Sequence, residues 1–562
     1  MNSFTFKNRY LDVPKRVISY FSPEVWVVIL SIIFAVGATT YYYLHGYIIA
    51  YGDAESHLNI AKRVVDSLTP GFAQLGGIWL PLPHIFLIPF VYFDFLWKTG
   101  LAGSIVSGIA FIISALYIYK LALLLTRHRG ASFFASLIFI FNPNILYLQS
   151  TPMTEMTLIV FFILSSYYFI LFLRNDKKII NLLFAAFFGF CASLSRYDGW
   201  ALVLMEAGVL FLFYFPYRFK FEAFIEKFLD DDSSDQIQIL ERKERISGPL
   251  SWSRLEGRLI MFCTLAFFGI ILWLAWDGLI LGDPLYFSHS QFSANSQQQG
   301  WLARGELPAY YNIFTSLIYY FVTSAETVGF LVASIAMVGI ASFLINKENR
   351  YRILILLIAF VPFFFNVITL FLGQSVIFLP GVTPITFDWT LFNVRYGVMM
   401  LPVFALFSGY IFYRSGTLGK ALVSSLLVLQ CLLFFMGFSS VLALEDGRAG
   451  LSSFIAKIPD AQGWLEENYD GGLLLTDDYA RTISIVRLPI KMQDVIYIGN
   501  KPYWEESLIE PEKYAKWIVM QKNDSIWKNL IDDELKQGRL YKYFNKAYTS
   551  EDILIFKRIA DN

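Results

Sequence analysis

Two carboxylates follow the first long apolar run of this 562-residue chain. Asp53 and Glu55 lie in the segment Gly52-Asp53-Ala54-Glu55-Ser56-His57, close behind the apolar residues 25–43. A carboxylate acts as a general base where it is ionised, fixed and within reach of the proton it removes. Held at a membrane surface, this pair suits the deprotonation of a hydroxyl group beside a lipid-borne substrate. The alternative is that Asp53 or Ser56 only caps a helix, because Asp and Ser are preferred caps.

Two arginines in later turns are candidates for binding a phosphate. Arg395 and Tyr396 follow a loop rich in Pro and aromatic residues, and Arg196 lies beside Asp198 in the turn 194–198. An arginine at a membrane surface can form bidentate hydrogen bonds with a phosphate group. Equally, it can anchor the end of a span by extending its side chain to the interface. Arg196 has a third interpretation, a local ion pair with Asp198.

Further ionisable residues could complete a polar cavity. Glu155 begins an apolar run, where it either adds an acidic face or is a favourable first-turn charge. With Asp53 and Glu55, His57 and His84 offer ligands for a divalent cation, but their spacing defines no closed ligand set. No cofactor is therefore assigned, and a divalent cation stays open. Acidic residues within or near apolar runs, expected to face the interior of the bundle, are Glu206, Asp277 and Glu326.

The composition is that of a polytopic membrane protein. The chain is 56% hydrophobic, 18% aromatic and only 16% charged, which makes the lipid bilayer its expected surroundings. Lys and Arg together number 45, as do Asp and Glu, so no excess of positive charge points to nucleic acid as a partner. The three cysteines lie far apart in apolar runs and form neither a metal-ligand spacing nor a disulfide framework.

Apolar runs of the length that crosses a bilayer, about 20 residues, recur along the chain. Eleven spans are predicted, at 25–43, 101–125, 131–149, 156–173, 179–194, 199–216, 259–281, 323–345, 353–372, 397–413 and 419–441. The run 82–97 is short and contains Pro83, Pro89 and Asp94, so a re-entrant or interfacial helix is the better interpretation. The predicted fold class is an all-α polytopic membrane protein with about 11 transmembrane helices and a small C-terminal α/β domain.

The distribution of Lys and Arg predicts the orientation of the spans. Outside the C-terminal domain, one set of loops carries 22 basic residues. The other set carries only Lys62, Arg63, Lys98, Arg196, Arg304 and Arg395. Because the basic loops face the cytoplasm, the N-terminus is predicted to be cytoplasmic and the first span to be a retained signal anchor in the plasma membrane. The candidate site residues and the C-terminal domain then lie on the outer face.

Two domains are predicted. Residues 1–444 form a membrane module with a first outer loop at 44–100 and a charged cytoplasmic insertion at 217–258. Residues 445–562 are less hydrophobic and alternate short apolar runs with helix-like segments, which is typical of a small α/β domain. Its predicted strands include 473–475, 518–520 and 553–556, and its predicted helices 461–467 and 527–537. Asp477-Asp478-Tyr479, after the first of these strands, is interpreted as a turn.

Residues 58–68 are predicted to form an amphipathic helix on the membrane surface. Apolar residues recur there at helical spacing, with Lys62, Arg63 and Asp66 on the other side. Such a helix would fix the acidic segment, as a loop preceding it, near the lipid headgroups.

The order of these motifs resembles the GT-C class of membrane glycosyltransferases, in particular the branch of protein O-mannosyltransferases and aminoarabinose transferases. The resemblance rests on the acidic motif 52–55, the surface helix, Leu80-Pro81-Leu82-Pro83, the acidic turn at Glu155, the basic turn at Arg196 and the Arg395-Tyr396 pair. It covers most of residues 25–441. The order of the motifs and their common sidedness carry the match.

The resemblance implies an enzyme that transfers a sugar, such as the hexose mannose, from a polyprenyl or dolichyl phosphate to an acceptor hydroxyl on the outer face. It implies that Asp53 is the general base, that Glu55 positions donor or acceptor, and that Arg395 with Arg196 and Tyr396 holds the donor phosphate. A single displacement would invert the anomeric carbon. The acceptor is left open among protein, lipid and glycan. Residues expected to line the cavity are His57, His84, Glu155 and Asp198.

The sequence departs from the family pattern in two places. Asp53 and Glu55 are separated by one residue, whereas the protein mannosyltransferases have an adjacent Asp-Glu pair, so the division of labour between them is open. The C-terminal domain lacks the Trp-Trp-Asp motif of oligosaccharyltransferases, which argues against transfer of a whole oligosaccharide to asparagine. The alternatives from sequence are a transporter or lipid flippase, a lipid-linked glycan polymerase or ligase, and a scaffold with an outer binding domain.

Overall fold

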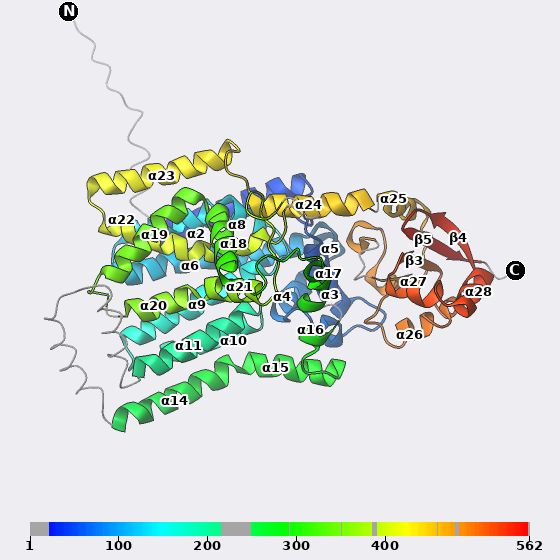
Figure 1. Ribbon diagram of the computed structural model, residues 1–562, viewed down its shortest axis with the longest axis horizontal. Helices are drawn as coiled ribbons and strands as arrows, with labels where there is room; N and C mark the ends of the chain where they lie inside the picture. Colours follow the sequence, from blue (N-terminus) through cyan, green and yellow to red (C-terminus); the bar gives the residue numbers. More distant parts are fainter. Residues whose placement is uncertain are drawn as a thin grey trace, which may run out of the picture.

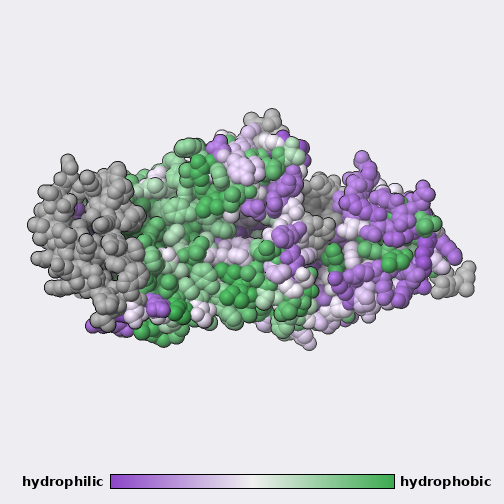
Figure 2. Space-filling view, turned by 60° about the horizontal axis from the view of Figure 1, so that its bottom comes forward, coloured by the Kyte–Doolittle hydropathy of each residue, from purple (hydrophilic) through white to green (hydrophobic). Residues whose placement is uncertain are grey.

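The fold is a long helical bundle with a small mixed sheet at one end (Figure 1). The structure, a computed structural model, describes residues 22–214, 249–290, 293–349, 351–384, 391–457, 459–477 and 483–559. The surface of the bundle is largely apolar where it is described, whereas the C-terminal end is hydrophilic (Figure 2). This contrast confirms the predicted class of a helical membrane protein with a small C-terminal α/β domain.

Every apolar run that was predicted to span the membrane contains helix. The bundle helices are α2 (Pro23–Leu44), α6 (Leu101–Thr126), α7 (Arg129–Ile140), α8 (Pro143–Leu148), α9 (Glu155–Arg174), α10 (Ile179–Ser193), α11 (Asp198–Tyr214), α14 (Pro249–Ala266), α15 (Phe268–Trp276), η3 (Asp277–Leu281), α18 (Ile313–Val328), α19 (Phe330–Ile345), α20 (Arg352–Ala359), α21 (Val361–Phe371), η4 (Val394–Met400), α22 (Leu401–Arg414) and α23 (Thr417–Phe435). Within the described ranges, six helices are long and apolar enough to cross a membrane, or up to eight if each bent pair forms one span.

Within the described residues, the helices of three other predicted spans are shorter than a full crossing helix. The run 131–149 is divided into α7 and α8, because Pro143 starts a new helix and the Asn142 side chain caps it by accepting from the N–H groups of Asn144 and Ile145 at 3.0 and 3.1 Å. The run 179–194 forms the 15-residue α10. The run 199–216 forms α11, which ends at the last residue before an undescribed segment.

The prediction of one continuous span over 323–345 is wrong. Helices α18 and α19 meet at an angle of 113° about Gly329. Gly329 has a φ of +101°, which a residue with a Cβ rarely adopts, and a Cβ there would lie 2.6 Å from the Gln430 side chain. Gln430 also accepts a hydrogen bond from the N–H of Leu331 at 3.0 Å. The Gln430 side chain of α23 therefore stabilises the bend.

Part of the predicted insertion 217–258 is helical, because α14 already begins at Pro249. The candidate span in this region is 253–281. The rest of the insertion, with Asp230-Asp231-Asp232, lies outside the described residues. The run 82–97 forms two short helices, α4 (Leu82–Val91) and α5 (Asp94–Thr99), in place of a span.

The predicted surface helix begins earlier and is more buried than the sequence suggested. Helix α3 runs from Gly52 to Val65, so the acidic segment forms its first turn and is not a loop before it. Lys62 and Arg63, expected on an exposed face, are both 3% exposed. Lys62 pairs with Asp94 at 2.6 Å, which the hydrophobic periodicity of residues 58–68 alone does not reveal. Among the short elements, η1 (Phe72–Leu75) packs on α3, whereas α16 (Tyr286–His289) contacts η3 and α17 (Ala294–Ala303).

The C-terminal domain is built on a five-stranded sheet of order β2-β1-β3-β5-β4. Its strands are β1 (Leu474–Thr476), β2 (Val495–Ile496), β3 (Trp517–Gln521), β4 (Phe544–Thr549) and β5 (Ile553–Arg558), and they include all three predicted strands. Strand β1 pairs in parallel with β2 and β3, and β5 pairs antiparallel with β3 and β4. In register, Leu475 lies opposite Ile518, and Val519 opposite Ile555.

Helices surround this sheet and connect it to the bundle. They are α24 (Leu442–Lys457), α25 (Pro459–Asn468), η5 (Ile485–Arg487), η6 (Met492–Asp494), α26 (Tyr503–Ser507), η7 (Pro511–Lys513), α27 (Ser525–Leu530) and α28 (Glu534–Tyr543). The predicted helix 527–537 is in fact divided between α27 and α28. Helix α24 runs across the proposed boundary at residues 444 and 445 and leads from the bundle to the domain (Figure 1).

Close packing of α19 on α22 generates a first prediction. A Cβ on Gly339 would lie 2.1 Å from the backbone oxygen of Phe407, and small residues are what let membrane helices approach so closely. Gly339→Ala should therefore force the two helices apart and cost about 1–3 kcal/mol of stability. The measurement is the apparent melting temperature of the purified protein in detergent.

Gly208→Ala is the matched control, because Gly208 also lies inside a helix but a Cβ there would meet nothing within 4 Å. This control should leave the melting temperature unchanged or raise it slightly. Equal melting temperatures for the two variants would contradict the packing argument.

Candidate active site

Four carboxylates lie at the N-terminal ends of four helices that meet in one place. Asp53 lies in the first turn of α3, Glu155 and Asp198 are the first residues of α9 and α11, and Asp446 is the fifth residue of α24. The positive end of a helix dipole stabilises a carboxylate at such a position. The same helix ends leave backbone N–H groups that favour an anionic ligand.

Arg395 stands at the centre of this group. Its Nη2 lies 2.7 Å from Asp53 Oδ2, its Nε 3.3 Å from Glu155 Oε1, and its Nη1 3.8 Å from Asp446 Oδ2. The Arg395 side chain is 6% exposed, whereas Asp53 is 34% exposed. The most accessible edge of the arginine is thus the edge that faces Asp53.

Glu155 joins the two predicted phosphate-binding arginines. Its Oε1 accepts from Arg196 Nη1 at 3.2 Å and from Arg395 Nε at 3.3 Å. The Tyr396 ring lies 5.1 Å from one guanidinium and 5.2 Å from the other. Arg196 also contacts Asp198 at 3.4 Å. The local ion pair with Asp198, one of the interpretations of Arg196 from sequence, is therefore present, and Arg196 also shares Glu155 with Arg395.

Asp446 and Tyr51 complete the group, and the sequence analysis missed both. The Tyr51 hydroxyl lies 3.3 Å from Asp446 Oδ2 and donates to the Ala443 oxygen at 2.5 Å, and its ring lies 4.8 Å from the Arg395 guanidinium. Burial raises the pKa of Asp446 to about 6, against the opposing effect of Arg395. A possible signal was the appearance of two acidic residues directly after the last apolar run.

Glu55 lies apart from Arg395, although it is only two residues from Asp53. It accepts from Arg487 Nε at 2.9 Å and from the Ser484 hydroxyl at 2.5 Å, both in the C-terminal domain. Arg487 also donates to the backbone oxygen of Ile49 at 2.8 Å. In this structure, then, Glu55 connects α3 to the C-terminal domain.

Other contacts of α3, of the segment after it and of α5 continue this interface. The Arg63 guanidinium stacks 3.7 Å from the centre of the Tyr497 ring, and the Asn500 side chain donates to Thr69 at 3.1 Å. Lys98 donates to the backbone oxygen of Ile490 at 3.1 Å. The helix that carries Asp53 is therefore packed between the bundle and the C-terminal domain.

His57 and His84 form a buried pair, with Nδ1 of His57 2.9 Å from Nε2 of His84. The His57 ring also packs on Trp79, with 4.7 Å between ring centres. Among the residues that the structure describes, no group of three or more His, Cys, Asp or Glu side chains is arranged to hold a metal ion.

The capping alternative for the acidic segment is wrong. The N-cap of α3 is Tyr51, whose side chain makes no capping hydrogen bond. Ser56 donates its hydroxyl to the Gly52 oxygen at 3.2 Å and does not cap the helix. Asp53 instead directs its carboxylate to Arg395.

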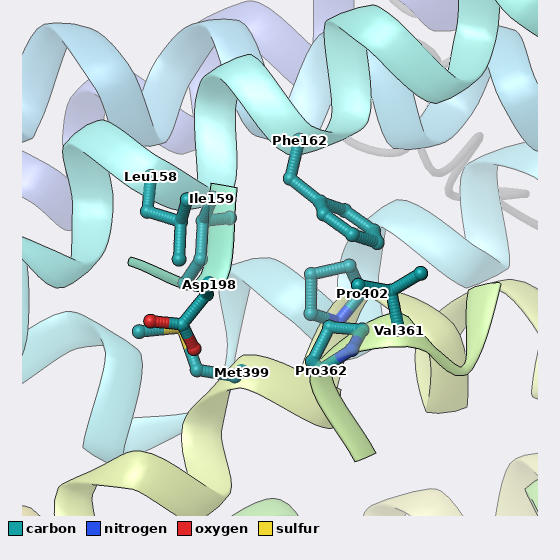
Figure 3. A pocket seen from close by; sticks show the side chains of 8 residues that line it. All are labelled: Leu158, Ile159, Phe162, Asp198, Val361, Pro362, Met399 and Pro402. Atoms are coloured by element: carbon teal, nitrogen blue, oxygen red, sulfur yellow. The ribbon is translucent and has the colours of Figure 1, made fainter. Parts of the chain in front are cut away.

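A narrow apolar pocket lies next to Asp198 (Figure 3). Helix α9 contributes Leu158, Ile159 and Phe162 to it. The facing wall comes from η4, α21 and α22, with Val361, Pro362, Met399 and Pro402. The Asp198 carboxylate points toward Met399 as the one charged group of the lining. Apolar surface therefore begins directly beside the Arg196–Asp198 pair.

The remaining acidic candidates are placed elsewhere. Glu206 is fully buried and accepts from the Ser165 hydroxyl at 2.8 Å. Asp277 is fully buried, and a Cβ on Gly77 would lie 2.8 Å from its Oδ1. Glu326 is half-buried in α18. Asp477 accepts from the N–H of Ser525 at 3.1 Å beside strand β1, and Asp478 and Tyr479 lie outside the described residues.

Comparisons with known proteins place this geometry in a fold class. No protein-family model matches the chain, and no curated protein matches its sequence significantly. Among solved structures, ArnT from Cupriavidus metallidurans bound to undecaprenyl phosphate is similar with a TM-score of 0.50 and 11% identity, over 93% of this chain and 98% of that chain. The apo oligosaccharyltransferase of Archaeoglobus fulgidus gives a TM-score of 0.45 and 11% identity, over 93% of this chain and 73% of that one.

The chain has the fold of the GT-C membrane glycosyltransferases. The similarity to ArnT extends over nearly the full length of both chains, including the C-terminal domain. The resemblance noted in the sequence is thereby confirmed at the level of the fold.

The burial of His57 generates a prediction about pH. Burial lowers the pKa of His57 to about 4, against the opposing charge of Asp53, while an unfolded histidine has a pKa of about 6.5. Between these values the unfolded chain binds a proton that the folded chain does not bind. Stability is therefore lost as the pH falls from 6.5 to 4, by up to about 3 kcal/mol from this residue.

His57→Asn removes this proton uptake, so its apparent melting temperature should fall less than that of the wild type between pH 7 and pH 4.5. His45→Asn, at an exposed position, is the control and should follow the wild type. Parallel curves for His57→Asn and the wild type would refute the expectation.

Proposed function

We propose that this protein is an integral membrane glycosyltransferase that moves a sugar from a polyprenyl or dolichyl phosphate to an acceptor hydroxyl. The observation that carries the proposal is the Arg395–Asp53 pair, a phosphate-binding type of group and a base in contact at 2.7 Å. The GT-C fold supports it, as does the bound undecaprenyl phosphate of the ArnT structure. A hexose such as mannose is the proposed sugar, and protein, lipid or glycan the acceptor.

On this proposal, binding of the donor phosphate to Arg395 also activates Asp53 as the base. A carboxylate held against a guanidinium is a poor base, because the cation favours its ionised form. The donor phosphate competes for the same exposed edge of Arg395, with Arg196 as the second cation on the other side of Glu155. When the phosphate takes that edge, Asp53 is released toward the acceptor.

The chemical step is then a single displacement. The acceptor oxygen attacks the anomeric carbon while Asp53 takes its proton. The bond from the anomeric carbon to the phosphate oxygen breaks, and its electron pair remains on the phosphate, where Arg395 and Arg196 offset the added charge. Attack opposite the leaving group inverts the anomeric centre. The activated lipid phosphate is itself the leaving group.

The surroundings of the site fit a lipid-borne donor. Apolar residues of α9, α21, η4 and α22 lie beside Asp198 and give the site an apolar side close to Arg196 (Figure 3). Glu55 is proposed to act through the C-terminal domain, by fixing it over the helix that carries the base. The proposal keeps the orientation predicted from the basic loops, with a cytoplasmic N-terminus and the site and the C-terminal domain on the outer face of the plasma membrane.

Asp53→Asn is the direct test. The variant should lose transfer by about 10²–10⁴-fold, because an amide cannot accept the proton. It should bind the donor as well as the wild type or more tightly, because it no longer competes with the phosphate for Arg395. Products from candidate lipid-phosphate sugars and acceptors are measured by mass spectrometry, and donor binding is measured separately.

Two variants serve as comparisons. Arg395→Lys keeps the charge but loses the planar fork, so donor binding should weaken by about tenfold to a hundredfold. Asp66→Asn, at the C-terminal end of α3, should transfer normally. Full activity of Asp53→Asn would exclude Asp53 as the base, and absence of transfer by the wild type with every donor would contradict the function.

A further inference from the structure

We infer that Asp446, which lies in the helix leading into the C-terminal domain, is a positioning residue that fixes the orientation of the Arg395 side chain. Its meaning for catalysis rests on the proposed function, since Arg395 is there the group that meets the donor phosphate. The placement of Asp446 is independent of that function. It contacts the arginine and Tyr51, the residue just before α3, and it lies beside the turn that carries the arginine.

The contacts of Asp446 converge on Arg395 from two directions. Its carboxylate lies 3.8 Å from Arg395 Nη1, and the nearby backbone of Asn393, two residues before Arg395, acts to lower the pKa of Asp446. Asn393 has a φ of +55°, a left-handed conformation that Asn tolerates better than most residues. Asp446 thus contacts the guanidinium and lies beside the turn from which η4 begins.

The helix that presents Asp446 is itself closely fixed to the bundle. The N–H of Ala443 donates to the Asn144 side chain at 2.8 Å, and the Ala443 oxygen accepts from Tyr51. A Cβ on Gly447 would lie 2.6 Å from the Tyr147 hydroxyl, so α24 packs tightly here. Asp446 is 5% exposed between these contacts. Its carboxylate therefore has a defined place.

A fixed third anion changes what happens when a phosphate displaces Asp53. Among the carboxylates that contact it, Arg395 would otherwise keep only Glu155, which it shares with Arg196. With Asp446 holding Nη1, the guanidinium retains its orientation and Nη2 stays directed toward the vacated position. The loss of Asp446 should therefore weaken donor binding rather than change the proton transfer.

The experiment compares Asp446→Asn with Glu445→Gln. Glu445 is the adjacent residue of the same helix, 45% exposed and paired with Arg448 at 3.3 Å. Binding of undecaprenyl phosphate to the purified full-length protein is measured by native mass spectrometry. Asp446→Asn should bind about threefold to tenfold more weakly and raise the donor KM with little change in kcat, whereas Glu445→Gln should equal the wild type.

A double-mutant cycle shows whether the effect passes through Arg395. In an Arg395→Gln background, Asp446→Asn should cause no further loss of binding, and the shifts in melting temperature should be non-additive. Equal binding by Asp446→Asn and Glu445→Gln, or the same loss in both backgrounds, would overturn the inference. The melting-temperature cycle needs no substrate, so it stands even if the wild type transfers no sugar and the proposed function fails.

If Asp446→Asn does not fold, Asp446→Glu takes its place. Glu445→Asp is then the control. The carboxylate is kept but shifted by one methylene, so the position of Arg395 should change. Undecaprenyl phosphate binding should then change by about twofold or more for Asp446→Glu and stay constant for Glu445→Asp. Unchanged binding in both would equally overturn the role of Asp446.

Discussion

The Arg395 guanidinium is almost fully withdrawn from solvent, and a charge in such a place costs several kcal/mol unless neighbouring groups compensate it. The compensation comes from Asp53, Glu155 and Asp446, which belong to three helices far apart in the sequence. Because each carboxylate must reach one edge of a planar group, the arginine fixes how α3, α9 and α24 meet. The arrangement of the bundle end follows from this one requirement.

Two features moderate the excess of negative charge in this group of side chains. Four carboxylates surround two guanidiniums, and three of the carboxylates lie in or near the first turn of their helices, where the dipole offsets part of the repulsion. Burial also raises the pKa of Asp446 to about 6, which lowers its mean negative charge near neutral pH. Under the proposed function, Asp53, the most exposed of the four carboxylates, is the one that the donor phosphate displaces.

The sequence was informative where a feature depends on neighbouring residues or on which side of the membrane a loop is predicted to lie. Basic residues at loop ends placed Asp53, Glu155, Arg196 and Arg395 on one side of the bundle, and these residues do come together. The bend at Gly329 and the true start of α3 were not predictable, because the first depends on Gln430 and the second on burial of Lys62 and Arg63. Asp446 was missed because its partners lie in distant elements that no periodicity links to α24.

The single residue between Asp53 and Glu55 has a geometric consequence. Two positions along an α-helix are about 200° apart around its axis, whereas adjacent positions are about 100° apart. Asp-x-Glu therefore directs one carboxylate to Arg395 and the other to Arg487, on nearly opposite sides of α3. An adjacent Asp-Glu pair, about 100° apart, would direct both carboxylates toward the same side of α3. In this chain the first turn of α3 therefore separates two contacts, that of Asp53 with the arginine of the bundle and that of Glu55 with the C-terminal domain.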